Sequence, residues 1–88
     1  MKGDENMLEK NGKAGLSLES ELVAMFIQTA SKFSSQINLK KGDKVANAKS
    51  IMGLISLGVV DGENITLSAD GIDAESALTE LSKFLNIG

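Results

Sequence analysis

The amino-acid sequence predicts a single α+β domain in which helices pack on one face of an antiparallel sheet. Three observations lead to this prediction. Apolar residues recur at three- and four-residue steps over 16–35, they alternate with polar residues over 63–70, and a Gly-Asp turn at 42–43 separates two short strand-like runs. The first pattern is typical of an amphipathic helix and the second of a half-buried strand. The third indicates a hairpin, which requires antiparallel pairing.

The first fourteen residues are the least patterned part of the chain. Met7 and Leu8 are the only apolar pair there beyond Met1. We therefore divide the chain into residues 1–14, a degenerate first strand or a tail, and an ordered domain over residues 15–88. A frayed first strand would leave the backbone edge of its neighbour open to pairing with another chain, so this segment leaves a homodimer open.

The helix expected within residues 16–35 has acidic residues at its beginning. Ser17 or Ser20 is expected to cap it, and Glu19 and Glu21 suit the positive end of its dipole. Its apolar stripe is Leu22, Met25, Phe26, Ala30 and Phe33, and Val23 and Ile27 widen it.

Two further helices and a strand follow the predicted hairpin over residues 36–48. A short helix is expected from about Ser50 to Gly58, and the last helix is expected to begin at Asp73 as its cap. Between them, the strand over residues 63–70 is expected to bury Ile65, Leu67 and Ala69.

Composition excludes several classes of function. The net charge is −3 and no arginine occurs, which argues against a nucleic-acid partner. Cysteine and histidine are absent, so thiol nucleophiles, the usual proton shuttle and the commonest metal ligand are missing. No apolar run approaches the roughly 18 residues of a membrane helix, and the N-terminus lacks the apolar stretch of a secretory signal. We expect a cytoplasmic protein that is not an enzyme, with no cofactor, metal or membrane partner.

Ser50 has two compatible roles. As an N-cap, its hydroxyl accepts a hydrogen bond from the first turn of the short helix. As a phosphorylation site, it would bring nearly two negative charges to the positive end of that helix, which tolerates them. Ile51, Met52 and Ile55 cannot all point inward on so short a helix, so apolar surface should remain exposed for a partner.

Three stretches of the sequence make a family recognisable. QTASKFSSQINL over 28–39, KSIMGLISLGV over 49–59 and ITLSADGIDAESALTEL over 65–81 resemble HPr, the small phosphocarrier of the bacterial sugar phosphotransferase system. The resemblance covers residues 22–85 almost continuously. It implies an open-faced β-sandwich, with a four-stranded antiparallel sheet and three helices on one face, and this agrees with the order of elements predicted from periodicity.

The phosphocarrier motif of the family is not preserved. It has the form Gly-Leu/Ile-His-Ala-Arg-Pro-Ala at the start of the first helix, and this chain has GLSLESELVA at residues 15–24. The histidine, arginine and proline are missing, and the distance to Gln28 is two residues longer. Ser17 falls at the histidine position if the gap is placed late, and Glu19 does so without a gap. Neither side chain can act as a phosphoimidazole carrier, so no catalytic residue is expected in the degenerate segment marked by Ser17, Glu19 and Glu21.

The second site of the family is intact by resemblance. In HPr-like proteins of Gram-positive type, the serine of KSIMG is phosphorylated by HPr kinase/phosphorylase, and the product binds the catabolite control repressor. Ser50 occupies that position, and Ile51, Met52 and Ile55 match the apolar contact positions. The sequence is similar in outline to the catabolite-repression HPr-like proteins, which lack the histidine and keep the serine.

Those proteins keep the arginine beside the lost histidine, whereas this chain has Glu19 and Glu21. In the family fold this segment lies near the serine helix, and two carboxylates at a ~8 Å separation would repel a phosphoserine by about 1 kcal/mol each. Two hypotheses follow. The first is a regulatory module switched by phosphorylation at Ser50, and the alternative is a non-phosphorylatable scaffold that docks Enzyme I or permease components.

Overall fold

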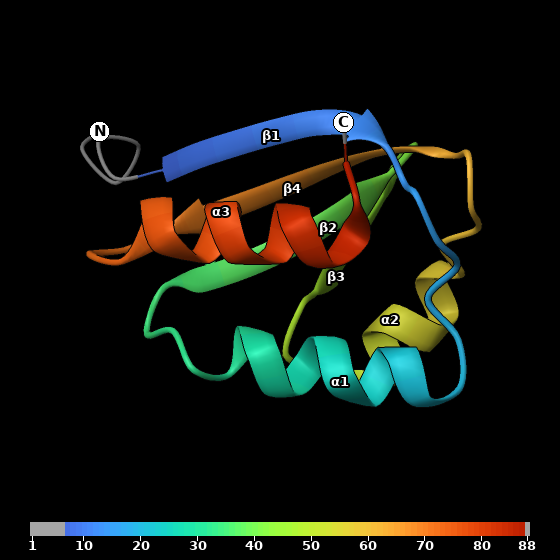
Figure 1. Ribbon diagram of the computed structural model, residues 1–88, viewed down its shortest axis with the longest axis horizontal. Helices are drawn as coiled ribbons and strands as arrows, with labels where there is room; N and C mark the ends of the chain where they lie inside the picture. The colour runs from blue at the N-terminus through green and yellow to red at the C-terminus, as the bar shows by residue number, and fades with distance from the viewer. Residues whose placement is uncertain (1–6, 88) are drawn as a thin grey trace.

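The computed structural model describes residues 7–87 and contains one antiparallel sheet with its helices on one face (Figure 1). The order of strands across the sheet is β1-β4-β2-β3. The α+β fold and the four-stranded sheet expected from the sequence are confirmed. The elements in chain order are β1 (Met7–Lys13), α1 (Glu21–Ala30), β2 (Gln36–Lys41), β3 (Lys44–Asn47), α2 (Ile51–Leu57), β4 (Asn64–Asp70) and α3 (Ala74–Leu85).

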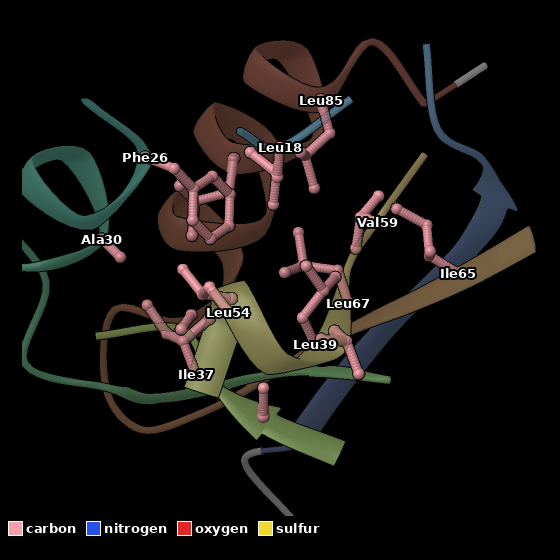
Figure 2. Close-up of a cluster of buried hydrophobic side chains, with 14 of the residues drawn as sticks. Leu18, Phe26, Ala30, Ile37, Leu39, Leu54, Val59, Ile65, Leu67 and Leu85 are labelled. Carbon is pink, nitrogen blue, oxygen red and sulfur yellow. The ribbon is translucent and has the colours of Figure 1, made fainter. Parts of the chain in front are cut away.

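The core lies between the sheet and the helices (Figure 2). β4 is central and pairs with both β1 and β2, and its alternating residues Ile65, Leu67 and Ala69 are buried as predicted. Phe26 of α1 and Phe84 of α3 meet edge to face, with ring centroids 5.5 Å apart. This aliphatic core with one aromatic pair fixes both long helices against the sheet.

The hairpin and the short helix form where the sequence predicts them. β2 and β3 pair up to Lys41 and Lys44, and Gly42 in the turn between them has φ 61°, a value that favours glycine. None of the helices within residues 7–87 has the length and apolar character needed to cross a bilayer.

β1 is an ordered strand, which decides one of the choices that the sequence left open. It pairs with β4 from Met7↔Asp70 to Lys13↔Asn64. None of its seven residues is buried, which explains the missing apolar alternation, because backbone hydrogen bonds hold this strand more than side-chain packing does. β1 covers the edge of β4, so the outer edge on this side of the sheet belongs to β1 itself. Residues 1–6 of the N-terminal segment lie outside the described residues.

The expected stripe of α1 is only partly correct. The helix buries Val23, Phe26 and Ala30, whereas Met25 is 49% exposed. The helix ends at Ala30, so Phe33 lies beyond it and packs against the core from the following loop.

Asp73 precedes α3, but its side chain does not cap that helix, so this expectation is wrong. One carboxylate oxygen accepts hydrogen bonds from the hydroxyl and the N–H of Ser35, the latter at 2.9 Å. The other accepts the N–H of Ser34 at 2.9 Å. These donors, first the Ser35 hydroxyl and then the Ser34 N–H, lower the pKa of Asp73 from 3.8 to about 2. Loop donors that are distant in sequence therefore take the place of the cap bond.

Candidate functional site

The start of α2 is a regular N-cap built on Ser50. Ser50 is extended (φ −111°, ψ 116°), and its hydroxyl oxygen accepts the N–H of Gly53 at 3.1 Å. The Leu54 N–H donates to the Ser50 carbonyl at 3.0 Å and begins the helical ladder. Gly58 ends the helix in the left-handed region, with φ 65°. The capping role expected for Ser50 is therefore confirmed.

The residues before Ser50 are held by two short-range hydrogen bonds and one bond to the end of the α1 segment. The Asn47 side-chain oxygen accepts the N–H of Lys49 at 2.8 Å, and the Asn47 carbonyl accepts the N–H of Ser50 at 3.0 Å. The Lys49 ammonium donates to the Phe33 carbonyl at 2.7 Å, just beyond the end of α1. The serine is thus presented on a fixed backbone and remains partly accessible.

An exposed apolar surface lies beside Ser50. Leu54 and Leu57 point into the core, whereas Ile51, Met52 and Ile55 are 50%, 71% and 57% exposed. We call these three residues the α2 face. Its exposure follows from the short helix, which buries only one side, as the sequence predicts.

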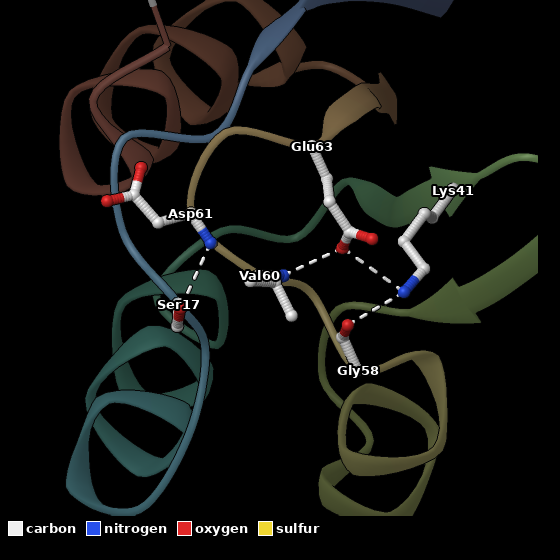
Figure 3. Close-up of polar contacts among 6 residues, drawn as sticks. All are labelled: Ser17, Lys41, Gly58, Val60, Asp61 and Glu63. Carbon is white, nitrogen blue, oxygen red and sulfur yellow. Dashed lines mark hydrogen bonds and ion pairs between the residues drawn. The ribbon is translucent and has the colours of Figure 1, made fainter.

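The segment that replaces the family's phosphocarrier motif is bound along the loop between α2 and β4 (Figure 3). The Leu18 N–H donates to the Val59 carbonyl at 3.0 Å, and the side chain of Leu18 is buried. The Ser17 hydroxyl oxygen accepts the N–H of Asp61 at 2.9 Å. Ser17 therefore bridges two loops instead of capping α1, and that expectation is wrong.

The same loop contains an ion pair that the sequence analysis missed. The Glu63 carboxylate accepts the Val60 N–H at 2.8 Å and pairs with the Lys41 ammonium at 3.2 Å (Figure 3). Lys41 also donates to the Gly58 carbonyl at 2.7 Å. The Val60 N–H first, and then Lys41, lower the pKa of Glu63 below its usual value. No local pattern could indicate a contact between side chains 22 residues apart.

Ser20 occupies the residue before α1 in an unusual conformation. Its φ is 53° and its ψ −129°, and its side chain makes no capping hydrogen bond. A serine in this glycine-favoured region costs on the order of 1–3 kcal/mol. Ser20 is therefore not the cap that the sequence suggested, and backbone strain is stored in the segment that departs most from the family.

A groove of about 590 Å³ separates this segment from the end of α2. The segment lines the groove near Ile55 and Gly58, whereas Ser50 is at the opposite end of α2. The repulsion expected between the acidic segment and a phosphate on Ser50 stays a prediction. No cluster of three or more potential metal ligands occurs within residues 7–87.

Comparison with known proteins identifies the family. Residues 13–86 match the family model described as the PTS HPr component phosphorylation site. The chain belongs to the PTS HPr family. The HPr-like protein Crh of Halalkalibacterium halodurans is 41% identical over 81 residues, which cover 90% of this chain and 96% of that protein.

Solved structures agree with this assignment. The crystal structure of HPr from Bacillus anthracis superposes with a TM-score of 0.85 at 37% identity, over 90% of this chain and 96% of that one. Crh from Bacillus subtilis, described as an intertwined dimer with a swapped domain, gives a TM-score of 0.74 at 43% identity, over 84% and 83% of the two chains. This chain is therefore a member of the phosphocarrier family, although it contains no histidine.

Proposed function

We propose that this protein is a regulatory binding module of the sugar phosphotransferase system, switched by phosphorylation of Ser50. The observation that carries the proposal is the placement of Ser50 at the cap of α2 beside the exposed α2 face. With no histidine in the chain, transfer of phosphate through an imidazole is unavailable. The kinship with Crh proteins supports a role in catabolite repression.

In the proposed step, the Ser50 hydroxyl oxygen attacks the γ-phosphorus of ATP, loses its proton and releases ADP. The product carries nearly two negative charges at the positive end of the α2 dipole, which favours an anion. A partner can then bind the phosphate and the α2 face together. By resemblance to the family, the enzyme is HPr kinase/phosphorylase and the partner is the catabolite control repressor.

The first test is phosphorylation with HPr kinase/phosphorylase and ATP, followed by intact-mass measurement. The wild type should gain one phosphate and Ser50→Ala none. Ser56→Ala is a matched control, because Ser56 is exposed on the same helix and should not affect labelling. An unlabelled wild type, or equal labelling of Ser50→Ala, would reject the switch.

The second test measures binding of the phosphorylated protein to the catabolite control repressor. Met52→Asp should weaken binding by at least tenfold, because it places a charge in the apolar contact. Ile72→Asp is the control, since Ile72 is 94% exposed in the loop before α3. Phosphate content is first measured for every variant, so that a loss of binding is not confused with a loss of labelling. Equal effects of the two substitutions would remove the α2 face from the interface.

The alternative function is a scaffold that docks Enzyme I or permease components without accepting phosphate. It is favoured by the groove, which places the degenerate segment and the end of α2 in one surface. Calorimetric titration with Enzyme I separates the two functions. Binding by the unlabelled protein supports the scaffold, and no heat at high micromolar concentrations removes it.

A second copy of this chain is a further candidate partner. β1 lies at the margin of the sheet with no buried residue, so an equivalent strand of another copy could replace it at little cost in packing. The swapped dimer described for Bacillus subtilis Crh supports this proposal. Light scattering during gel filtration tests it, and a monomer mass at every concentration would contradict it.

A further inference from the structure

The groove beside the degenerate segment combines an apolar wall with an acidic rim. Ile55 and Val60 line it and are 57% and 52% exposed. Buried Leu18 and Val59 lie in the same lining. Glu19 stands in the opposite wall and is exposed. The groove therefore offers apolar contact surface and a negative charge within a volume of about 590 Å³.

Two hydrogen bonds donated by backbone N–H groups hold the two walls together. The Leu18 N–H donates to the Val59 carbonyl, and the Asp61 N–H donates to the Ser17 hydroxyl oxygen. The Val60 N–H is held in turn by the Glu63 carboxylate. A groove whose walls are tied in this way exists before a partner arrives, so less conformational entropy is lost on binding.

The charge around the groove is negative. Glu19 is the charged residue in its lining, and Glu21 and Asp61 directly follow the lining residues Ser20 and Val60. All three are exposed, and none of them forms an ion pair with another residue of the described range 7–87. Lys41 is the cation bonded to the groove-lining loop, and it is already engaged by the Gly58 carbonyl and Glu63. At the corresponding segment the family motif has an arginine, so this chain has reversed the sign of the charge there.

We propose that this groove binds a basic segment of a partner protein. An apolar side chain of the partner packs on the exposed Ile55 and Val60, and a neighbouring lysine or arginine meets Glu19 and Glu21. Complementary charge determines which partners bind. The acidic rim attracts basic segments and repels the acidic surfaces that would pair with the arginine of the family motif. The groove shares only Ile55 with the α2 face, and its occupation needs no phosphate on Ser50.

The test uses two model peptides, one of leucine and lysine at helical spacing and one in which glutamate replaces every lysine. Each is titrated into the isotope-labelled Ser50→Ala protein and followed by amide chemical shifts. The lysine peptide should shift the amides of residues 17–20 and 55–60, and the glutamate peptide should not. Equal binding of both peptides, or shifts centred elsewhere, would overturn the proposal. The use of Ser50→Ala keeps this result separate from the outcome of the phosphorylation test.

Charge-reversal variants exclude unspecific attraction between a basic peptide and a chain of net charge −3. Glu19→Lys with Glu21→Lys should weaken binding of the lysine peptide by about tenfold, because two favourable pairs become repulsive. A second pair of Glu→Lys substitutions, which changes the net charge by the same amount, serves as the control. Glu9→Lys with Glu75→Lys alters two exposed glutamates that form no ion pair within residues 7–87, and Glu75 lies in the first turn of α3 as Glu21 does in α1. If both double variants weaken binding equally, the groove is not the site.

Discussion

The starts of α1 and α2 use the same residue type with opposite results. Ser50 is extended and caps α2 through the Gly53 N–H, whereas Ser20 has a positive φ and makes no cap bond. The stretch around Ser50 matches the family signature, and the stretch around Ser20 is where the chain departs from the family. The comparison teaches that the retained site follows local rules of helix capping, and the altered site does not.

The two regions also differ in the range of the contacts that hold them. Around Ser50, the bonds to Gly53 and between Asn47 and Lys49 join residues three and two positions apart, and the bond from Lys49 to Phe33 spans 16 residues. Ser17 is held by the Asp61 N–H, which is 44 residues away. The first region therefore forms mostly from its own sequence, and the second takes its shape from the loop against which it lies.

The largest expected effect tests whether the altered segment is anchored as firmly as α2. Leu18→Ala and Leu54→Ala each remove a buried side chain, so each should lower the free energy of unfolding by about 2–4 kcal/mol in urea titrations. A loss below about 1 kcal/mol for Leu18→Ala alone would show that the segment is only loosely attached.

The two serines should differ when each is replaced by alanine. Ser50→Ala removes a cap bond and should cost about 1 kcal/mol of unfolding free energy. Ser20→Ala removes no capping hydrogen bond and should leave the free energy of unfolding nearly unchanged. Thermal and urea unfolding of both variants measure the contrast, and equal losses would break it.

A glycine at position 20 should raise stability slightly. The positive φ of Ser20 is unfavourable for any residue with a β-carbon, so Ser20→Gly should add about 0.5–1 kcal/mol after the larger entropy of the unfolded chain is counted. Ser50→Gly is the counterpart and should not stabilise, because Ser50 is already in a favourable extended conformation. If Ser20→Gly is no more stable than the wild type, Ser20 carries little strain.

The start of α3 adds a pH-dependent case with a smaller effect. The pKa of Asp73 falls from 3.8 to about 2 on folding, so its contribution to stability is present above about pH 4 and is lost as the pH falls toward 2. Urea midpoints between pH 6 and pH 2.5 should fall less steeply for Asp73→Asn than for the wild type. Parallel curves for the two proteins would contradict the depressed pKa.

Local patterns could predict much of the candidate site. Ser50, the span of α2 and the exposed α2 face follow from a cap residue, a short apolar period and a terminal glycine. The groove could not be predicted, because it needs the segment carrying Glu19 to lie beside the end of α2. The Lys41–Glu63 pair was missed for the same reason, since its partners meet only when β2 and the loop before β4 are assembled.

By itself the sequence determined the central strands, the hairpin and α2, because each has its own apolar period, turn or cap within a few residues. It also determined that phosphate cannot be carried on histidine, which is a matter of composition. Only the tertiary structure decided that residues 7–13 form β1, that Ser17 bonds to the Asp61 backbone and that the Asp73 carboxylate binds Ser34 and Ser35. In each of these cases the partner is a backbone or loop donor far along the chain, and backbone groups leave no pattern in the order of side chains.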